Sequence, residues 1–512
     1  MKRNILKDTI LLTVIQMTLD GLALVLNVFL TRQLGTEAIG ILTLTASFFR
    51  LAALTSNGNA FLCVSRFISE ELGRSERDPR AVLRLCIGVS MVLSGVFTAV
   101  LLCCAPWCSV HFLKSPALAA PIRLMALSLP LVALTSCVRG WFNACCKSGL
   151  CAASDTVDFL VRSVIMLLFV FLSPARTPEG LCHLTAVSMI AGAAGQLLFL
   201  FCFLPSCKAE RTGRASLDLG RYLRLALPVM GGSALTSFLS SANDALVPIT
   251  LRQAGNSTAE AFSQFGIFEA IILPTLFFPS TVLCSLAGIL ITETAREKAA
   301  GRSVRITRLT ETAVRKTIVF AVFVTAILMI LGRQLGELLG GGEVAGKMIV
   351  LLAPVVPFIY LEIVLESIIK GIGEQAFSSV NYLCEYIIRI SFVLLFIPVF
   401  GFYGIVISYY ASNICGNLSR IICIIRKTGM PPDPVRLVGI PVFSAVFSTQ
   451  LTRMALSLCR MEPGYSILSM CLFTAMDGAL YLLVQRGLFR LCGTITTAGR
   501  FPALLKSNKS EA

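Results

Sequence analysis

Two acid–arginine pairs lie inside long apolar stretches of this chain. The stretch NYLCEYIIRISFVLLFIPVF contains Glu385 and Arg389, four residues apart. Asp158 and Arg162 have the same spacing in DTVDFLVRSVIMLL. Residues four apart lie on one face of a helix, so each acid can neutralise its own arginine. Charges inside membrane helices face the interior of a helix bundle or a water-filled cavity. Two roles stay open for these pairs: locking their helices against neighbours, or lining a transport path.

Other charges lie in apolar stretches without a partner at that spacing. Arg50 is central in TASFFRLAALTSNGN, and Asp20 is central in the first apolar block, with Asn27 two turns later. Asp20 has two possible roles, pairing with Arg50 or binding a coupling proton or sodium ion. Arg50 is either a site residue or the partner of an acid on another helix. Three further candidates lie in the parts of their blocks that are nearer the outer face of the membrane: Arg123, Asp244 and Glu269.

The composition shows what kind of helices must position these residues. The chain has 512 residues, of which 56% are hydrophobic and only 14% charged, with a mean hydropathy of +0.81. Soluble proteins carry about 25% charged residues. Fourteen apolar blocks can be counted, and a helix needs roughly 20 apolar residues to span a bilayer. The sequence predicts an all-α polytopic membrane protein with about 14 transmembrane helices, because blocks of this length are too long for barrel strands.

The basic residues follow a topological pattern. The net charge is +16, and alternate loops are rich in Lys and Arg. By the positive-inside rule these loops are cytoplasmic, which places both termini in the cytoplasm and agrees with an even number of helices. The excess charge therefore requires no nucleic-acid partner. The basic segments are the N-terminus, 65–84, 205–224, 292–317, 420–436 and the C-terminal tail. Within the tenth block, Glu366 and Lys370 have the spacing of an interfacial pair.

Internal similarity predicts a duplication. Glu385–Arg389 follows Asp158–Arg162 by the same interval that separates Pro357 from Pro130. The tripeptide Gly-Arg-Ser recurs at residues 73 and 301, at nearly that interval. Two lobes of six helices would both begin on the same side of the membrane, which makes the repeat parallel. The predicted parts are 1–210 and 211–428 as six-helix lobes, and 429–512 as an appended helix pair with a cytoplasmic tail.

The sequence offers no sign of an enzyme. It has no GxxxxGK[ST] phosphate loop and no HExxH motif, and its 19 cysteines lie mostly in apolar blocks. The only histidines are His111 and His183, so we expect no metal and no cofactor. The first apolar block is too long for a signal peptide and is expected to be retained. Any transport would be secondary, driven by a proton or sodium gradient or by the membrane potential.

An ordered set of motifs resembles a known family. Residues 7–74, from KDTILLTVIQMTLDG to SRFISEELGR, are similar to the opening of the stage V sporulation protein B family. That family belongs with polysaccharide flippases, lipid II flippases and multidrug and toxin extrusion proteins. The resemblance covers roughly residues 5–430. Four further motifs follow in the expected order: RGWF, VDFLVR, LPVMGGS and YGIVISYYASNICGNL.

The resemblance implies two lobes around a central cavity, working by alternating access in the bacterial cytoplasmic membrane. It implies a polyprenyl-diphosphate-linked saccharide as cargo, an oligosaccharide or a peptidoglycan precursor, moved between leaflets. Arg50, Arg162 and Arg389 would face the diphosphate. Relatives usually place basic residues in the first helix, where this chain has Asp20. We expect a monomer whose partners are the bilayer and this lipid.

Two alternatives remain. An acid in the first helix resembles the coupling site of some multidrug extrusion proteins. A cation-coupled exporter of drugs or organic cations would use Asp20, Asp244 and Glu269. A non-transporting scaffold for envelope assembly, recruiting enzymes through its basic loops, is the third reading.

Overall fold

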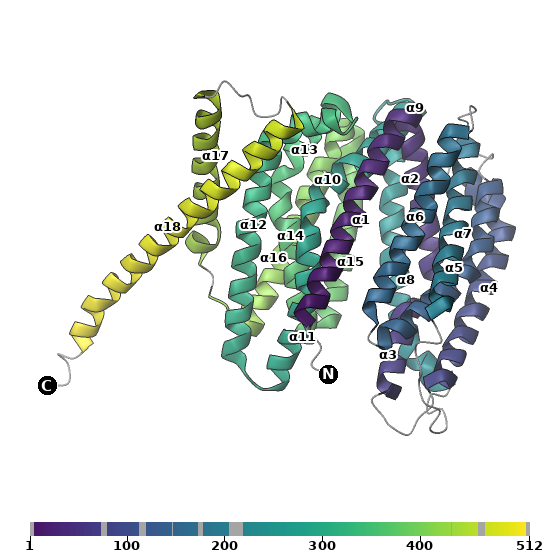
Figure 1. Cartoon of the computed structure of the whole chain (residues 1–512), viewed down its shortest axis with the longest axis horizontal. Coiled ribbons are helices and arrows are strands. Elements are labelled where there is room, and N and C mark those ends of the chain that lie inside the picture. Colours follow the sequence, from purple (N-terminus) through teal and green to yellow (C-terminus); the bar gives the residue numbers. More distant parts are fainter. Residues whose placement is uncertain are drawn as a thin grey trace. The chain divides into compact units, whose positions relative to one another are not determined.

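The computed structural model is built of helices (Figure 1). It describes residues 5–72, 79–111, 119–145, 147–172, 178–203, 219–431, 433–458 and 466–507. All regular elements in these ranges are helical, which confirms the all-α prediction. The first Gly-Arg-Ser tripeptide and most of the basic segment 205–224 lie outside the described ranges.

The first part of the chain forms α1 (Ile5–Leu34), α2 (Thr36–Asn57), α3 (Ala60–Leu72), α4 (Pro79–His111), α5 (Ala119–Ala144), α6 (Ser148–Leu172), α7 (Pro178–Phe203), α8 (Leu219–Gln253), α9 (Thr258–Ile267), the π-helix η3 (Phe268–Ile272) and α10 (Leu273–Phe277). There follow the 3₁₀ turn η4 (Phe278–Ser280), α11 (Thr281–Ala299), α12 (Ser303–Leu338), α13 (Gly342–Leu352), the 3₁₀ turn η5 (Ala353–Val355), α14 (Val356–Gly371), α15 (Gln375–Phe400), the 3₁₀ turn η6 (Gly401–Tyr403), α16 (Gly404–Thr428), the π-helix η7 (Val435–Gly439), α17 (Ile440–Leu458) and α18 (Ile467–Ser507).

The helices are long and apolar enough to make this a multi-pass membrane protein. Among the described residues, eleven stretches meet that requirement. The longest, Gln375–Thr428, contains both α15 and α16, which turn at Gly401 with a φ of 58°. Helix α6 is not among the eleven, because it carries Asp155, Asp158 and Arg162. The number fourteen therefore stays a prediction.

Large apolar side chains also lie on the outside of these helices. Phe171 at the end of α6 is 75% exposed and Val399 on α15 is 73% exposed. Hydrocarbon is as apolar as these side chains, so a membrane helix can present them outward without the cost they would have in water. Their exposure agrees with helices that are surrounded by lipid.

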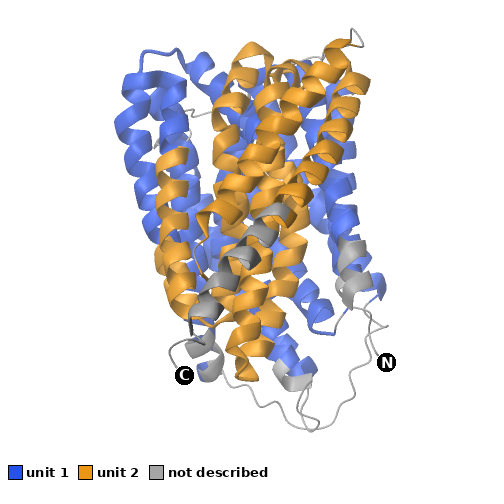
Figure 2. Ribbon diagram, turned by 90° about the vertical axis from the view of Figure 1, so that its left-hand side faces the viewer, with its two compact units in different colours: residues 1–274, 382–408 blue, residues 275–381, 409–512 orange. Residues whose placement is uncertain are grey.

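The chain forms two compact units (Figure 2). Unit 1 comprises Met1–Pro274 with Tyr382–Ser408, and unit 2 comprises Thr275–Asn381 with Tyr409–Ala512. The units group helices by contact, whereas the predicted lobes 1–210 and 211–428 group them by a sequence repeat. The lobe boundaries stay a prediction.

In unit 1, two glycines bring α2 against α9. A Cβ on Gly40 would lie 1.9 Å from the Phe262 carbonyl oxygen, and one on Gly266 would lie 2.4 Å from the Thr36 oxygen. Small residues let membrane helices approach backbone to backbone. This contact fixes the helix that carries Arg50 against the segment that leads into Glu269.

In unit 2, glycines likewise allow α12 and α13 to approach closely. A Cβ on Gly336 would lie 2.2 Å from the Gly346 nitrogen. The core of this unit is apolar and centred on α14, where Val364, Leu365 and Ile368 are fully buried. Tyr481 of α18 packs into the same core, which attaches the C-terminal helix to α12 and α14.

Candidate functional site

Four charged residues from four elements form one electrostatic cluster in unit 1. They are Arg50 on α2, Asp244 on α8, Glu269 on η3 and Arg389 on α15. We call these four residues the charge cluster. The opposite charges of the two acids and two arginines lower the cost of holding charge inside a membrane protein, and Glu385, which pairs with Arg389, adds a further negative charge.

Within the charge cluster, the Asp244 side chain is nearly buried and is held by a hydrogen bond. It is only 10% exposed, and its Oδ2 atom accepts a hydrogen bond of 2.6 Å from the Ser47 hydroxyl. The Arg50 Nη2 atom lies 3.9 Å from the same oxygen, and the Arg50 side chain is 64% exposed. This distance is too long for a hydrogen bond. The carboxylate is therefore held in place while the guanidinium can reach another anion.

Glu269 lies in a π-helical turn. The Leu273 amide donates to the Phe268 carbonyl, which widens the helix around this residue. Such turns occur mostly as single bulges and are frequent at functional sites. Glu269 is partly buried and interacts with Asp244, Arg50 and Arg389. The widened turn thus places a second carboxylate within electrostatic range of both arginines.

Both predicted acid–arginine pairs are confirmed. Arg389 Nη2 lies 3.2 Å from Glu385 Oε1, and Arg162 Nε lies 2.9 Å from Asp158 Oδ1. Their surroundings differ, however. Arg389 also belongs to the charge cluster, whereas the pair on α6 lies against Gly192 of α7. The α6 pair therefore contributes to helix packing in unit 1.

Replacing Gly192 by leucine should destabilise unit 1. Even a Cβ at this position would lie 2.4 Å from Asp158 Oδ1 and 2.7 Å from Arg162 Cγ. Overpacking typically costs about 1–3 kcal/mol. We expect a lower thermal midpoint for Gly192→Leu in detergent, with little change for Gly149→Leu, where the structure has open space. An unchanged midpoint in Gly192→Leu would contradict this packing role.

The remaining sequence candidates lie elsewhere in unit 1. Asp20 accepts a hydrogen bond of 2.9 Å from Gln16, one turn earlier on α1. Asn27 donates to the Ala270 carbonyl over 3.4 Å and so links α1 to η3. Arg123 is exposed on α5. The possible pairing of Asp20 with Arg50 is wrong, because the acid that meets Arg50 is Asp244.

Sequence reasoning missed an ion pair between α5 and α6. Arg139 Nη2 lies 2.8 Å from Asp155 Oδ2, and Gln196 of α7 donates to the other oxygen of Asp155 over 2.8 Å. The Arg139 guanidinium also lies 5.4 Å from the centre of the Phe61 ring. Arg139 and Asp155 belong to the stretches RGWF and DTVDFLVR noted above. They are 16 residues apart, so the spacing of residues on one helix face could not predict their pairing.

Unit 2 contains a second network that the sequence did not reveal. Arg420 was assigned to a basic loop, but it lies inside α16 and its side chain is fully buried. Its guanidinium meets Glu362 at 3.2 Å and Glu366 at 3.4 Å, both on α14. Glu366 also pairs with Lys370 at 3.2 Å. The predicted Glu366–Lys370 pair is therefore confirmed, but as part of a buried network and not as a simple interfacial pair.

Comparison with known proteins shows a family resemblance. Residues 5–255 match the family described as polysaccharide biosynthesis protein. The chain is 23% identical to stage V sporulation protein B of Bacillus subtilis (strain 168) over 419 residues, covering 79% of this chain and 80% of the relative.

Two solved structures share the architecture. The lipid II flippase MurJ in an inward closed conformation matches with a TM-score of 0.72 and 11% identity, over 94% of this chain and 99% of that one. An inward-facing multidrug resistance MATE transporter of the MOP superfamily matches with a TM-score of 0.64 and 14% identity, over 81% and 95%. Residues 5–255, just under half of the chain, thus resemble the polysaccharide biosynthesis protein family, and the fold of the chain is the one shared by these flippase and multidrug transporter structures.

Proposed function

We propose that this protein is a secondary transporter that flips a lipid-linked oligosaccharide or a peptidoglycan precursor across the bacterial cytoplasmic membrane by alternating access. The charge cluster of unit 1 is the observation that carries this proposal. It sets the largely exposed Arg50 beside a carboxylate that is held by another group. The family match and the similarity to a sporulation protein support the same substrate class.

The chemistry of the proposed cargo fits this site. A polyprenyl diphosphate has an anionic head and a long apolar tail. Arginine binds phosphate oxygens through charge-assisted, often bidentate hydrogen bonds. Arg50 and Arg389 would compensate the diphosphate, while the tail would stay in the lipid. Arg162 pairs with Asp158 and lies against Gly192, so we assign it a packing role.

The two acids of the charge cluster supply a means of coupling. While both are ionised, they compete with the cargo for the two arginines. A proton taken up by Asp244 or Glu269 would release an arginine for the diphosphate, and loss of that proton would favour release. Transport would then respond to a proton gradient or to the membrane potential, which supplies about 2.3 kcal/mol per charge per 100 mV. Sodium is the other ion to be tested.

Leaflet exchange in proteoliposomes tests the proposal. Purified protein would be reconstituted with a fluorescent undecaprenyl-diphosphate saccharide, and the outer-leaflet label would be quenched over time. We expect protein-dependent exchange that changes with an imposed proton gradient or potential. A fluorescent phosphatidylcholine in the same vesicles controls for leakage. Absence of exchange for every saccharide lipid, under potential and under sodium or proton gradients, would contradict the proposal.

A cation-coupled multidrug exporter is the second candidate. The partly buried Glu269, the nearly buried Asp244 and the polar Asp20–Gln16 turn are groups that could bind an organic cation, and a MATE structure shares the fold. Ethidium efflux from the same vesicles decides between the candidates. Efflux that is lost in Asp20→Asn, without any movement of the saccharide lipid, would favour the exporter.

The orientation and assembly of the protein belong to the same proposal. We place both termini in the cytoplasm, because the basic segments 292–317 and the C-terminal tail are then on the side that the positive-inside rule requires. We propose a monomer, since one chain supplies all four members of the charge cluster. Membrane-impermeant labelling of an engineered C-terminal cysteine in intact cells and in lysed cells would test the orientation.

A further inference from the structure

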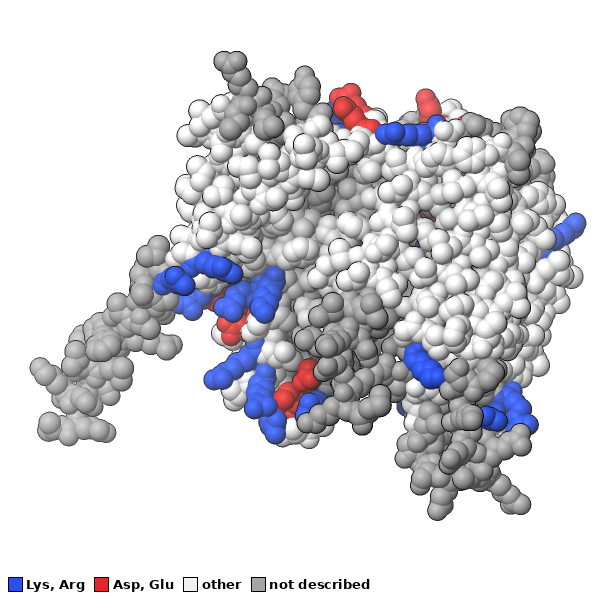
Figure 3. Space-filling view, in the orientation of Figure 1, with Lys and Arg blue, Asp and Glu red and all other residues white. Residues whose placement is uncertain are grey.

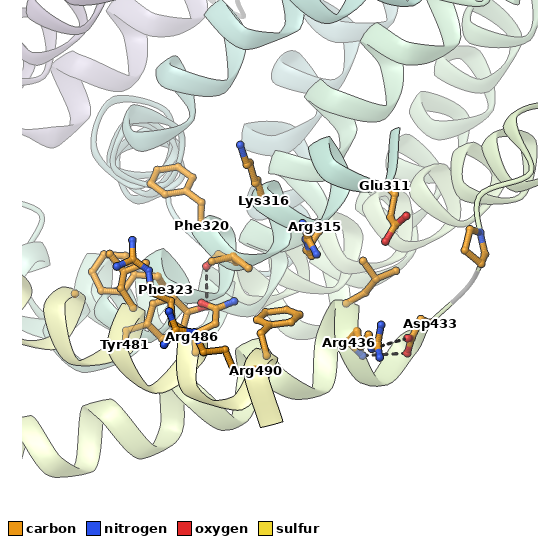
Figure 4. Close-up of a pocket in the computed structure, with 17 residues that line it drawn as sticks. Glu311, Arg315, Lys316, Phe320, Phe323, Asp433, Arg436, Tyr481, Arg486 and Arg490 are labelled. Carbon is orange, nitrogen blue, oxygen red and sulfur yellow. Dashed lines mark hydrogen bonds and ion pairs between the residues drawn. The ribbon is translucent and has the colours of Figure 1, made fainter. Parts of the chain in front are cut away.

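Unit 2 contains a cavity of about 1020 Å³ that takes no part in the proposed transport site. Its lining comes from α12, from the segment around η7 and from α18 (Figure 4). Ligand sites in proteins usually enclose about 300–1,000 Å³. The cavity is therefore large enough for part of a lipid.

The lining has two chemically different parts. Val319, Phe320, Phe323, Tyr481 and Leu482 supply apolar and aromatic surface. Five cations line the same cavity together with two acids, Glu311 and Asp433. The cations are Arg315, Lys316, Arg436, Arg486 and Arg490. An apolar wall beside a net positive rim matches an amphiphile with an anionic head.

The two helices change from basic to apolar beside this cavity. Helix α12 runs from Arg315-Lys316 directly into TIVFAVFV, and α18 runs through an apolar stretch to Gln485-Arg486. Residues from both boundaries line one cavity, so the boundaries lie at one level. Lys and Arg near the ends of membrane helices extend to the lipid headgroups. Figure 3 shows Lys and Arg gathered over the region where α12 and α18 are drawn in Figure 1.

Arg436, Asp433 and Arg315 already have partners within the cavity. Arg436 Nε lies 3.4 Å from Asp433 Oδ2, and the Arg315 guanidinium lies 5.6 Å from the centre of the Phe489 ring. One acid thus offsets one arginine, and the lining as a whole remains positive. Exposed Lys316 and Arg486 lie on different helices and extend the positive rim from α12 to α18.

One buried polar atom in the lining has no hydrogen-bond partner. Gln485 is 5% exposed, and its Oε1 atom meets no donor. The neighbouring polar group on the same face, the Tyr481 hydroxyl, donates to the Val319 carbonyl over 2.9 Å. A buried amide usually finds a partner. A ligand hydroxyl would supply the donor that Gln485 lacks.

We propose that this cavity binds an anionic phospholipid of the surrounding bilayer. The phosphate would lie among Arg315, Lys316 and Arg486, a glycerol hydroxyl would donate to Gln485, and an acyl chain would follow the aromatic wall of α12 and α18. The positive rim favours an anionic over a zwitterionic headgroup, since juxtamembrane Lys and Arg attract anionic lipids. The cavity shares no residue with the charge cluster, so this inference does not depend on the transported cargo.

Native mass spectrometry in a neutral detergent tests the proposal with three probes. They are phosphatidylglycerol, phosphatidylcholine with the same acyl chains, and glycerol phosphate, which has the head but no chains. We expect phosphatidylglycerol to bind tightest, and removal of each cation to weaken it about five-fold. The double variant Arg315→Gln/Arg486→Gln should therefore lose about 25-fold, while phosphatidylcholine binding should barely change.

The control removes the same charge from outside the cavity. Arg296 and Arg308 are exposed, and neither lines the cavity. Arg296→Gln/Arg308→Gln should keep phosphatidylglycerol binding within about two-fold of wild type. If Arg315→Gln/Arg486→Gln does not fold, the single variant Lys316→Gln changes only an exposed side chain and should still lose about five-fold.

Three results would overturn the proposal. Equal loss in the control and cavity variants would show that bound lipid responds only to total charge. Glycerol phosphate binding as tightly as the lipid would make this a site for free phosphate. Displacement of phosphatidylglycerol from the cavity by a polyprenyl diphosphate at equal concentration would assign the cavity to the cargo.

Discussion

Arg50→Gln should reduce leaflet exchange by about 10- to 100-fold while the protein remains folded. Glutamine has a shorter side chain that stays polar, and the variant removes the charge. Hydrogen bonds to charged groups contribute about 1.5–3 kcal/mol, and each 1.4 kcal/mol is a factor of ten. The exchange rate of a fluorescent polyprenyl-diphosphate saccharide in proteoliposomes measures the loss directly.

The choice of replacement separates charge from geometry at this position. Arg50→Lys keeps the charge but cannot bind phosphate with two parallel hydrogen bonds, so we expect an intermediate rate. Arg252→Gln is the matched control, because Arg252 is exposed in the last turn of α8 in the same unit. A folded Arg50→Gln protein that exchanges lipid at the wild-type rate would remove the charge cluster from the mechanism.

Arg420→Ala should lower the free energy of unfolding by about 3–5 kcal/mol, the usual cost of removing one member of a buried ion pair. The variant leaves Glu362 and Glu366 without the guanidinium that meets both. Glu366 is only 5% exposed and would keep its contact with Lys370 but lose the guanidinium. The loss of helical circular dichroism on heating in detergent would show the lower stability.

Two companion variants test whether the cause is the loss of the Arg420 charge between these two acids. Arg426→Ala removes an exposed arginine from the last turn of the same helix and should change stability by about 0.5 kcal/mol or less. Arg420→Met combined with Glu362→Gln and Glu366→Gln removes all three charges and should recover most of the loss. Equal stability of Arg420→Ala and Arg426→Ala would contradict a structural role for this network.

The charge cluster of unit 1 and the Arg420 ion-pair network of unit 2 hold their arginines in different ways. Arg420 is fully buried and is held by two carboxylates, an arrangement that suits fixed packing of α14 against α16. Arg50 is largely exposed and lies 3.9 Å from its acid, which leaves it able to exchange partners. The proposed transport role therefore follows from geometry, since both residues are arginines inside long helices.

The sequence was most informative where the contacts are local. Glu385–Arg389 and Asp158–Arg162 were predicted from their spacing and are present at hydrogen-bonding distance. Helix periodicity places residues four apart on one face wherever the helix lies. The same reasoning could not find the partner of Arg50, because Asp244 is on another helix far along the chain. Asp20 is nearer to Arg50 in the sequence than Asp244 is, but the acid that meets Arg50 is Asp244.

The sequence alone determined that the chain lies in a lipid bilayer and that its fold is all-α. Apolar blocks of spanning length require helices in a bilayer, because a backbone in lipid must satisfy its own hydrogen bonds, and the ordered motifs indicated the family. Only the tertiary structure decided which charges meet: Arg50 with Asp244, Arg420 with Glu362 and Glu366, and the cations of α12 with those of α18 around one cavity. In unit 1, α2 and α9 approach closely at Gly40 and Gly266, and Glu269 lies in a widened turn. These features arise from packing between segments distant in the chain, which local periodicity does not encode.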